Sequence, residues 1–381
     1  MMGMMAQRAF VIPNRLLVQT GLAVSFLFLL ANTAIHGKPR HSAIDKYVAY
    51  SEVFPSLKDV ATMANLSHLV YKFKSERNFT CADFYPSVEN NTEHLTCELY
   101  IHEYFLGTQV LMLSNNKEKY IAIVFAGTDD IMTMIEDTNI LTKPFGNNST
   151  VHLTPKANQL KERAKVHSGF NNAVFTHDIW ERIYAKTKYL MHLHPTYRLW
   201  TTGHSLGGAN AILTATAFAS LNRNRRVLSV SFGCPQTGNY YWREYFNDTS
   251  PLSNNLGIWR VVLGWDLVPR LPEFFHHVGH TIQIDVKTGE SKAYYEHYGN
   301  VERGYAGVPN GWYAKSHAWL PSALSFHRMT KYVENIAKLE PASWAKHFYP
   351  VHSNVYDDDD DDINPLDDWP GQDETQFIDT Y

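Results

Sequence analysis

The sequence predicts an α/β fold, with a mostly parallel central sheet covered by helices on both faces. Three observations favour this class. Apolar strands alternate with helical segments along most of the chain, which is typical of parallel sheets. One strand leads through a Gly-His-Ser-Leu-Gly turn directly into a helix. The chain has 381 residues, 44% of them hydrophobic, enough for a large buried core.

The first half of the chain changes from helical to strand periodicity. Residues 43–76 are expected to be helical because apolar residues recur at three- and four-residue steps. Residues 97–105 and 108–114 then alternate or run apolar, which predicts two strands. A polar turn, "NNKEK", precedes a buried strand at 120–128 that ends in Gly-Thr.

The second half continues the alternation. Residues 173–191 predict a helix that stops near Pro195, and its apolar side comprises Trp180, Ile183, Tyr184, Thr187 and Leu190. The remaining expected elements are a strand at 197–202, a helix at 209–221, strands at 226–233 and 258–264, and a hairpin at 280–295 that turns at Thr288–Gly289.

The N-terminal residues 1–34 are predicted to be a secretory signal peptide. Arg8 and Arg15 precede the apolar run 21–31, and small and polar residues follow it, as in signal sequences. A membrane anchor in the secretory pathway is the alternative, because a looser apolar stretch approaches spanning length. Residues 43–350 are expected to form one domain.

The charge is distributed unevenly. The whole chain has a formal charge of −4, but residues 356–381 contain 11 acidic residues and no Lys or Arg. Residues 1–355 therefore have 34 basic and 27 acidic residues, a formal charge of +7. The acidic segment has no periodicity and repels itself, which predicts a disordered tail. The overall charge excludes a strongly basic nucleic-acid binder.

Two further features favour secretion. Cys81 and Cys97 flank a polar loop and are expected to form a disulfide in an oxidising compartment, whereas Cys234 is expected to be buried and unpaired. The chain also has six N-x-Ser/Thr glycosylation acceptors: Asn65, Asn78, Asn90, Asn147, Asn148 and Asn247.

Residues 203–207 have the pattern of a nucleophile elbow. A strand enters Gly203, Ser205 follows, and a small-residue helix leaves after Gly207. The glycines let strand and helix approach closely, and the helix N-terminus favours negative charge near the serine oxygen. Ser205 is therefore the candidate nucleophile and the Leu206 N–H an oxyanion donor. A glycine-rich turn with an incidental serine is the alternative.

The acid of a catalytic triad is expected in a loop after a later strand. A serine hydroxyl needs a base to take its proton, and that base needs an acid to orient it. Asp266 follows an apolar strand, and Pro269 and Pro272 enforce an irregular loop after it. A carboxylate that only caps this loop is the alternative.

His327 is the preferred base, because it opens an amphipathic helix whose preceding loop can carry the imidazole over the serine. His317 is the second candidate. The histidines favoured less are His276, His277, His280, His297, His347 and His352. A second oxyanion donor is expected from Thr128, at the end of the buried strand 120–128.

These motifs together resemble a known family. "VFAGT", "VHSGF", "TTGHSLGGA", "VSFGCPQTGN", "GWDLVPRLP", "HHVGH" and "HRMTKY" occur in the order seen in class 3 lipases, over roughly residues 60 to 335. The resemblance implies an α/β-hydrolase fold and ester hydrolysis without a cofactor. It assigns Ser205, Asp266 and His327 as the triad, and Thr128 with Leu206 as the oxyanion hole.

The sequence departs from the family pattern at two places. Ala126 stands where the family usually has Arg, and the expected lid after Thr128 lacks the usual tryptophan. That stretch still places Ile131, Met134 and Ile135 on one helical face, as a lid over an apolar cleft requires. A plain surface helix is the alternative.

The sequence thus predicts a secreted serine esterase that acts on acylglycerols, with a lipid ester as its substrate and a lipid–water interface as a possible partner. No nucleic acid and no obligate protein partner are expected. Phospholipid, galactolipid or feruloyl esters are alternative substrates. A non-catalytic lipid- or cell-wall-binding protein on the same fold is the alternative of another class.

Overall fold

The structure is a computed structural model, and the fold lies within the unit Val53–Tyr381. The residues it describes are 54–73, 79–87, 92–128, 141–147, 151, 153, 163–222, 224–247, 255–264, 266–272, 275–286, 288–295, 321–342, 344 and 348–349. The predicted signal (1–34), the acidic tail (356–381), His317 and the lid residues Ile131, Met134 and Ile135 lie outside these residues.

A nine-stranded sheet forms the centre, in the order β1-β2-β3-β6-β7-β8-β9-β10-β11. Strands β3, β6, β7, β8 and β9 pair parallel in that order, and β10 pairs parallel with β11. The antiparallel pairs are β1 with β2, β2 with β3, and β9 with β10. The strands are β1 (Leu95–Glu103), β2 (Thr108–Asn115), β3 (Tyr120–Phe125), β6 (Arg198–His204), β7 (Val227–Phe232), β8 (Leu256–Leu263), β9 (His280–Ile284), β10 (Ser291–Tyr295) and β11 (Phe348–Tyr349). This confirms the predicted mostly parallel sheet.

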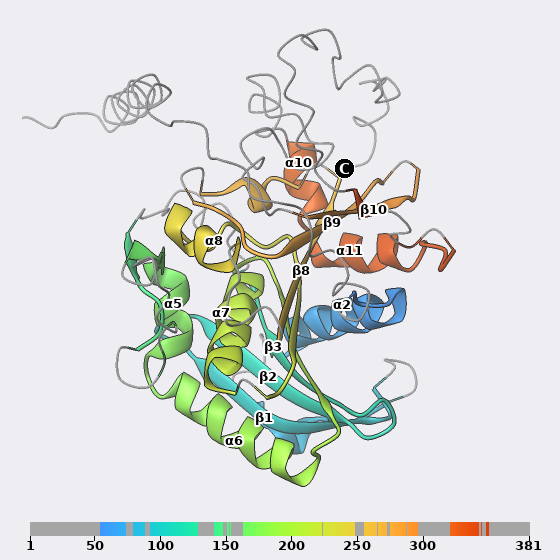
Figure 1. Ribbon diagram of the computed structural model, residues 1–381. Helices are drawn as coiled ribbons and strands as arrows, with labels where there is room; N and C mark the ends of the chain where they lie inside the picture. Colours follow the sequence, from blue (N-terminus) through green and yellow to red (C-terminus); the bar gives the residue numbers. More distant parts are fainter. Residues whose placement is uncertain are drawn as a thin grey trace, which may run out of the picture. The chain divides into compact units, whose positions relative to one another are not determined.

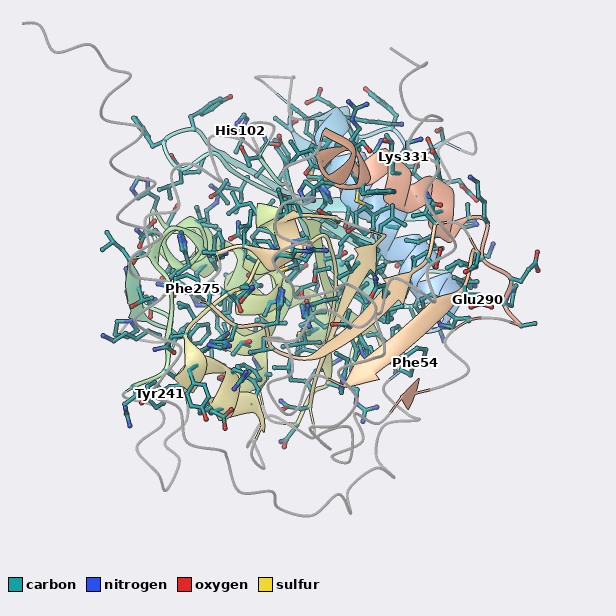
Figure 2. The ribbon with its side chains drawn as sticks, turned by 90° about the horizontal axis from the view of Figure 1, so that it is seen from above. Phe54, His102, Tyr241, Phe275, Glu290 and Lys331 are labelled. Atoms are coloured by element: carbon teal, nitrogen blue, oxygen red, sulfur yellow. A yellow bond between two sulfur atoms is a disulfide. The ribbon has the colours of Figure 1, made fainter. Side chains whose placement is uncertain are left out.

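Helices cover both faces of the sheet (Figure 1). They are α2 (Leu57–Lys72), α5 (Ser168–Phe175), α6 (Ile179–Leu193), α7 (Leu206–Leu221), α8 (Tyr240–Asn247), α10 (Pro321–Phe326) and α11 (Met329–Ile336). Figure 2 shows Lys331 of α11 and Tyr241 of α8 on opposite sides of the strands. A short second sheet pairs β4 (Thr142–Pro144) with β5 (Lys165–His167).

Two apolar clusters fill the space on either side of the sheet. One joins α5, α6 and α7 to the strands and contains Trp180, Phe218 and Trp242. The other lies under α2 and α11 and contains Trp200 and Trp259. Because both faces are covered, β2, β3 and β7 are almost wholly buried, which explains their continuous apolar sequences.

Several element boundaries differ from the predictions. The predicted helix 173–191 is two helices, because His177 and Asp178 adopt left-handed φ values of 52° and 59° between α5 and α6. Strand β1 ends at Glu103, so Tyr104 and Phe105 belong to a turn, and β3 ends at Phe125. Helix α7 begins at Leu206, three residues earlier than predicted.

The remaining fold predictions concern the hairpin, the cysteines and membrane crossing. Strands β9 and β10 pair antiparallel around Gly289, as predicted. Cys81 and Cys97 form a disulfide, and Cys234 is free and buried. Within the part of the chain that the structure describes, no helix combines the length and the apolar character needed to cross a bilayer.

Candidate active site

Ser205 lies in a strained turn between β6 and α7. Its backbone has φ 56° and ψ −131°, a left-handed φ that non-glycine residues adopt rarely and that clusters at functional sites. A Cβ on Gly203 would overlap the carbonyl oxygen of Gly207, and a Cβ on Gly207 would overlap that of Phe125. Glycine is therefore required on both sides of Ser205, because strand and helix approach each other too closely for any side chain.

The Ser205 side chain is buried and has no hydrogen-bond partner among the described residues, while its backbone is fixed. The Ser205 N–H donates to the Phe232 carbonyl at the end of β7 (2.9 Å). A buried hydroxyl without a partner is rare and costs free energy, so it calls for an explanation. A reacting group that waits for its substrate is one such explanation.

Asp266 and His327 form a buried pair, although they are far apart in the sequence. Both carboxylate oxygens of Asp266 lie 2.9 Å from His327 Nδ1. The neighbouring backbone fixes the carboxylate, because the Val268 N–H donates to Asp266 Oδ1 (3.0 Å). Since a carboxylate only accepts, His327 Nδ1 carries a proton, and Nε2 is the ring nitrogen that could take a proton from a serine.

His327 and Ser205 converge at the carboxyl end of β7. His327 Nε2 is buried without a partner among the described residues, as is the Ser205 hydroxyl. Gly233, which follows the Phe232 that binds Ser205, has φ +56°, and a Cβ on it would lie 2.6 Å from Asp266 Oδ2 and 2.9 Å from His327 Cε1. The structure therefore brings together the three residues predicted for the triad.

His327 does not lie in a helix. It occupies the turn between α10 and α11, whose N-cap is Arg328, so the prediction that it opens the helix is wrong by two residues. This position leaves the His327 carbonyl available to a side-chain donor.

Tyr332, which was not predicted from the sequence, holds the carboxylate from the other side. Its buried hydroxyl donates to Asp266 Oδ2 (2.6 Å) and accepts from the Leu263 N–H (3.2 Å). Tyr332 lies on α11, within the "HRMTKY" stretch that contains His327. That motif was a signal for this residue, although the sequence alone does not say what the phenol touches.

A second hydrogen-bonded chain, also missed, runs from the loop after β3 to His327. The Gly127 N–H donates to the Tyr71 hydroxyl (3.1 Å), which lies 2.8 Å from His204 Nδ1. His204 Nε2 lies 2.5 Å from the His327 carbonyl oxygen. Because a carbonyl only accepts, His204 carries its proton on Nε2, and its Nδ1 accepts from the Tyr71 hydroxyl.

His204 is neutral in this chain of hydrogen bonds. Burial first, and then the neighbouring charge of His327, hold the pKa of His204 well below its usual range. The ring therefore positions its neighbours instead of exchanging protons. It couples the backbone of Gly127 to the backbone of His327.

The loop that leads to Thr128 and the first turn of α7 both lie beside the serine. A Cβ on Gly127 would lie 3.0 Å from Ser205 Cβ and 2.6 Å from the His204 carbonyl oxygen, so the loop leading to Thr128 touches the elbow. Leu206 is the first residue of α7, where an N–H has no acceptor within its own helix and the helix dipole favours negative charge. Backbone donors from two elements thus lie beside the serine.

The competing histidines within the described residues are engaged elsewhere. His277 is buried and its Nε2 donates to the Pro269 carbonyl (2.6 Å). Burial and then Arg243 lower the pKa of His276 to about 4. His280 stacks on Trp259 with ring centroids 4.4 Å apart. His297, His347 and His352 lie outside the described residues.

The parallel sheet, the strand–serine–helix elbow and helices on both faces define an α/β-hydrolase fold. The sequence profile of the family described as "Lipase (class 3)" matches residues 122–276. The middle of the chain is thus similar to the class 3 lipases. The matched segment contains Thr128, Ser205 and Asp266 but ends before His327, whose assignment therefore depends on the sequence pattern and the geometry described above.

Similar proteins include a lipase from Rhizopus niveus, 27% identical over 190 residues, which are 48% of this chain and 43% of that protein. A secreted mono- and diacylglycerol lipase 1 from Fusarium solani is 27% identical over 180 residues, 46% of each chain. The match thus spans less than half the length of these relatives.

A solved structure of the triacylglyceride lipase of Rhizomucor miehei has the same fold. It superposes with a TM-score of 0.51 at 22% identity and covers 62% of this chain and 82% of that one.

Proposed function

We propose that this protein is a serine carboxylic-ester hydrolase that cleaves acylglycerol esters. The observation that carries the proposal is the pair of buried, unpartnered atoms, Ser205 Oγ and His327 Nε2, in a strained elbow beside a histidine held by Asp266. A purely structural turn has no use for an unsatisfied hydroxyl and an unsatisfied imidazole nitrogen at the same place.

The mechanism follows from these roles. His327 Nε2 takes the proton from Ser205 Oγ as the oxygen attacks the ester carbonyl, and Asp266 stabilises the imidazolium. The N–H groups of Leu206 and Thr128 donate hydrogen bonds to the developing oxyanion. His327 then gives its proton to the departing alcohol oxygen, which leaves an acyl ester on Ser205. A water molecule, deprotonated by His327, attacks this ester and releases the fatty acid.

The match to the class 3 lipase profile supports a lipid ester as the substrate, and the similar mono- and diacylglycerol lipase of Fusarium solani favours acylglycerols. Phospholipid, galactolipid and feruloyl esters remain the alternatives to be tested beside them. We also propose that Ile131, Met134 and Ile135 form a lid. The six glycosylation acceptors and the Cys81–Cys97 disulfide support secretion through a signal in residues 1–34.

Turnover of a water-soluble ester such as p-nitrophenyl butyrate tests the proposal. We expect Ser205→Ala to lower kcat by at least about 10⁴-fold with unchanged unfolding temperature, because triad members act as a unit. A matched control is Ser220→Ala, since Ser220 lies at the far end of the same helix α7. A folded wild-type protein without esterase activity on any of the four ester classes would instead favour a non-catalytic binding protein.

A further inference from the structure

We propose that the tip of the β1–β2 hairpin, Tyr104 and Phe105, is an anchor that inserts into a lipid surface and holds the catalytic edge of the sheet against it. These two residues form the hairpin tip. The proposal rests on the proposed function, because it names the surface from which an ester hydrolase of this kind receives its substrate.

The strand register places the hairpin tip at the edge of the sheet that carries Ser205. Phe125 of β3 pairs with Gly203 of β6, and Val110 of β2 pairs with Phe125. Because Glu103 pairs with Thr108, two residues beyond Val110, the β1–β2 turn extends past the level of the nucleophile. Three strand spacings separate β1 from β6, about 14 Å laterally at about 4.8 Å each.

The loop of Gly127 lies between the hairpin and the serine. The Ala126 N–H donates to the Gln109 carbonyl (3.1 Å), which joins that loop to the base of the hairpin. The base of the hairpin is therefore hydrogen-bonded to the proposed oxyanion loop, which lies beside Ser205.

The hairpin tip exposes two aromatic side chains. Phe105 is 91% exposed and Tyr104 is 59% exposed. A glycine, Gly107, completes the turn at φ +63°, and a Cβ there would meet nothing within 4 Å. The turn thus projects from the protein, and water around an exposed phenyl ring is released when the ring enters a lipid phase.

Local contacts hold the hairpin tip in shape. The Phe105 N–H donates to Glu103 Oε1 (3.1 Å), and the Tyr104 ring stacks on His102 with centroids 3.9 Å apart. Glu103 also lies 3.7 Å from His177 Nδ1, which ties the hairpin to the junction of α5 and α6. Figure 2 shows His102 at the periphery of the molecule.

A lipid surface fits the hairpin tip better than a protein partner. Two consecutive residues on a narrow turn are too small for a stable protein interface, which buries about 800 Å² on each side. An aromatic pair with one hydroxyl suits the boundary between headgroups and acyl chains, where Tyr is enriched. Because the hairpin tip lies at the edge of the sheet that carries Ser205, binding of the tip to lipid brings Ser205 close to a lipid ester.

Binding to phosphatidylcholine vesicles that contain diolein tests the proposal, measured by co-sedimentation in the Ser205→Ala background so that the lipid stays intact. We expect Phe105→Ser to lower the partition coefficient about tenfold, and Tyr104→Ser with Phe105→Ser to lower it further. The matched control is Tyr189→Ser, an aromatic residue of α6 that is 56% exposed, which should change nothing.

A second measurement separates this proposal from the proposed function. With Ser205 intact, the Phe105→Ser variant should have the wild-type kcat/KM on soluble p-nitrophenyl butyrate. Its rate of hydrolysis of emulsified diolein should be about tenfold lower than that of the wild type. Unchanged vesicle binding by a folded Phe105→Ser variant overturns the proposed anchor. The proposal is also overturned if the protein is a dimer and Phe105→Ser dissociates it while vesicle binding stays the same. If the wild type hydrolyses no ester, the proposed function fails while the vesicle result still decides the anchor.

Discussion

At the scale of single residues, the site depends on hydrogen bonds that fix where protons lie. Asp266 accepts from three donors, His327 Nδ1, the Tyr332 hydroxyl and the Val268 N–H. These donors leave the carboxylate little freedom to rotate, so the imidazole it holds has one orientation and one tautomer. Such preorganisation lowers the reorganisation needed during the reaction.

Tyr332→Phe is expected to lower kcat about tenfold and to leave KM nearly unchanged. The ring still packs between Phe232 and His204, but the carboxylate loses a charge-assisted hydrogen bond, worth about 1.5–3 kcal/mol. Steady-state kinetics on a soluble ester measures both constants. Tyr184→Phe, a hydroxyl removed from α6 on the other face of the sheet, is the control. An unaltered kcat would contradict a positioning role for Tyr332.

At the scale of elements, the elbow requires β6 and α7 to approach each other over Gly203 and Gly207. This requirement was visible in the sequence because strand, glycine pattern and small-residue helix are contiguous. The break between α5 and α6 was not, because His177 and Asp178 carry no glycine or proline signal, and residues 173–191 keep a helical period across it. Likewise, "CELYIHEYF" alternates as a strand to its end, so the exposed turn at Tyr104 and Phe105 has no signature of its own.

Gly203→Ala should inactivate the enzyme and lower the free energy of unfolding by more than about 3 kcal/mol, because the new Cβ overlaps backbone that cannot move away. Urea unfolding and soluble-ester turnover measure the two effects. Gly107→Ala is the matched control, since open space surrounds that glycine and only its left-handed φ opposes the change, at about 1 kcal/mol. Equal effects of the two substitutions would refute the close approach of β6 and α7.

At the scale of the whole molecule, residues from both ends of the described chain meet at one edge of the sheet. Most strands of the central sheet, the helices α2, α6 and α7, and the identity of the triad candidates could be predicted from periodicity and motif, whereas β4, β5, α8 and α10 were not predicted. The contact of Tyr71 with His204 could not, because it joins residues 133 positions apart and leaves no periodic trace in the sequence. Tyr332 escaped prediction for a related reason: its motif was apparent, but its partner lies on another element.

The buried histidines make global stability depend on pH. Burial lowers the pKa of His204 and His277 well below 6.5, and that of His276 to about 4. The unfolded chain therefore binds more protons than the folded chain below pH 6.5, so the free energy of unfolding falls as the pH falls. Each histidine contributes up to about 1.4 kcal/mol per pH unit.

Urea unfolding at pH 7, 6 and 5 measures this dependence. The free energy of unfolding should decrease at each step, and His276→Asn should reduce the slope. A free energy of unfolding that stays constant or rises between pH 7 and 5 is incompatible with neutral, buried histidines at these positions.

The most direct test of the central claim is covalent labelling with a fluorophosphonate, which reacts only with a serine activated by a neighbouring base. Peptide mass spectrometry of the labelled protein should find one adduct, on Ser205, and His327→Ala should abolish it while the protein stays folded. Labelling that survives His327→Ala, or an adduct on a different serine, would contradict the account.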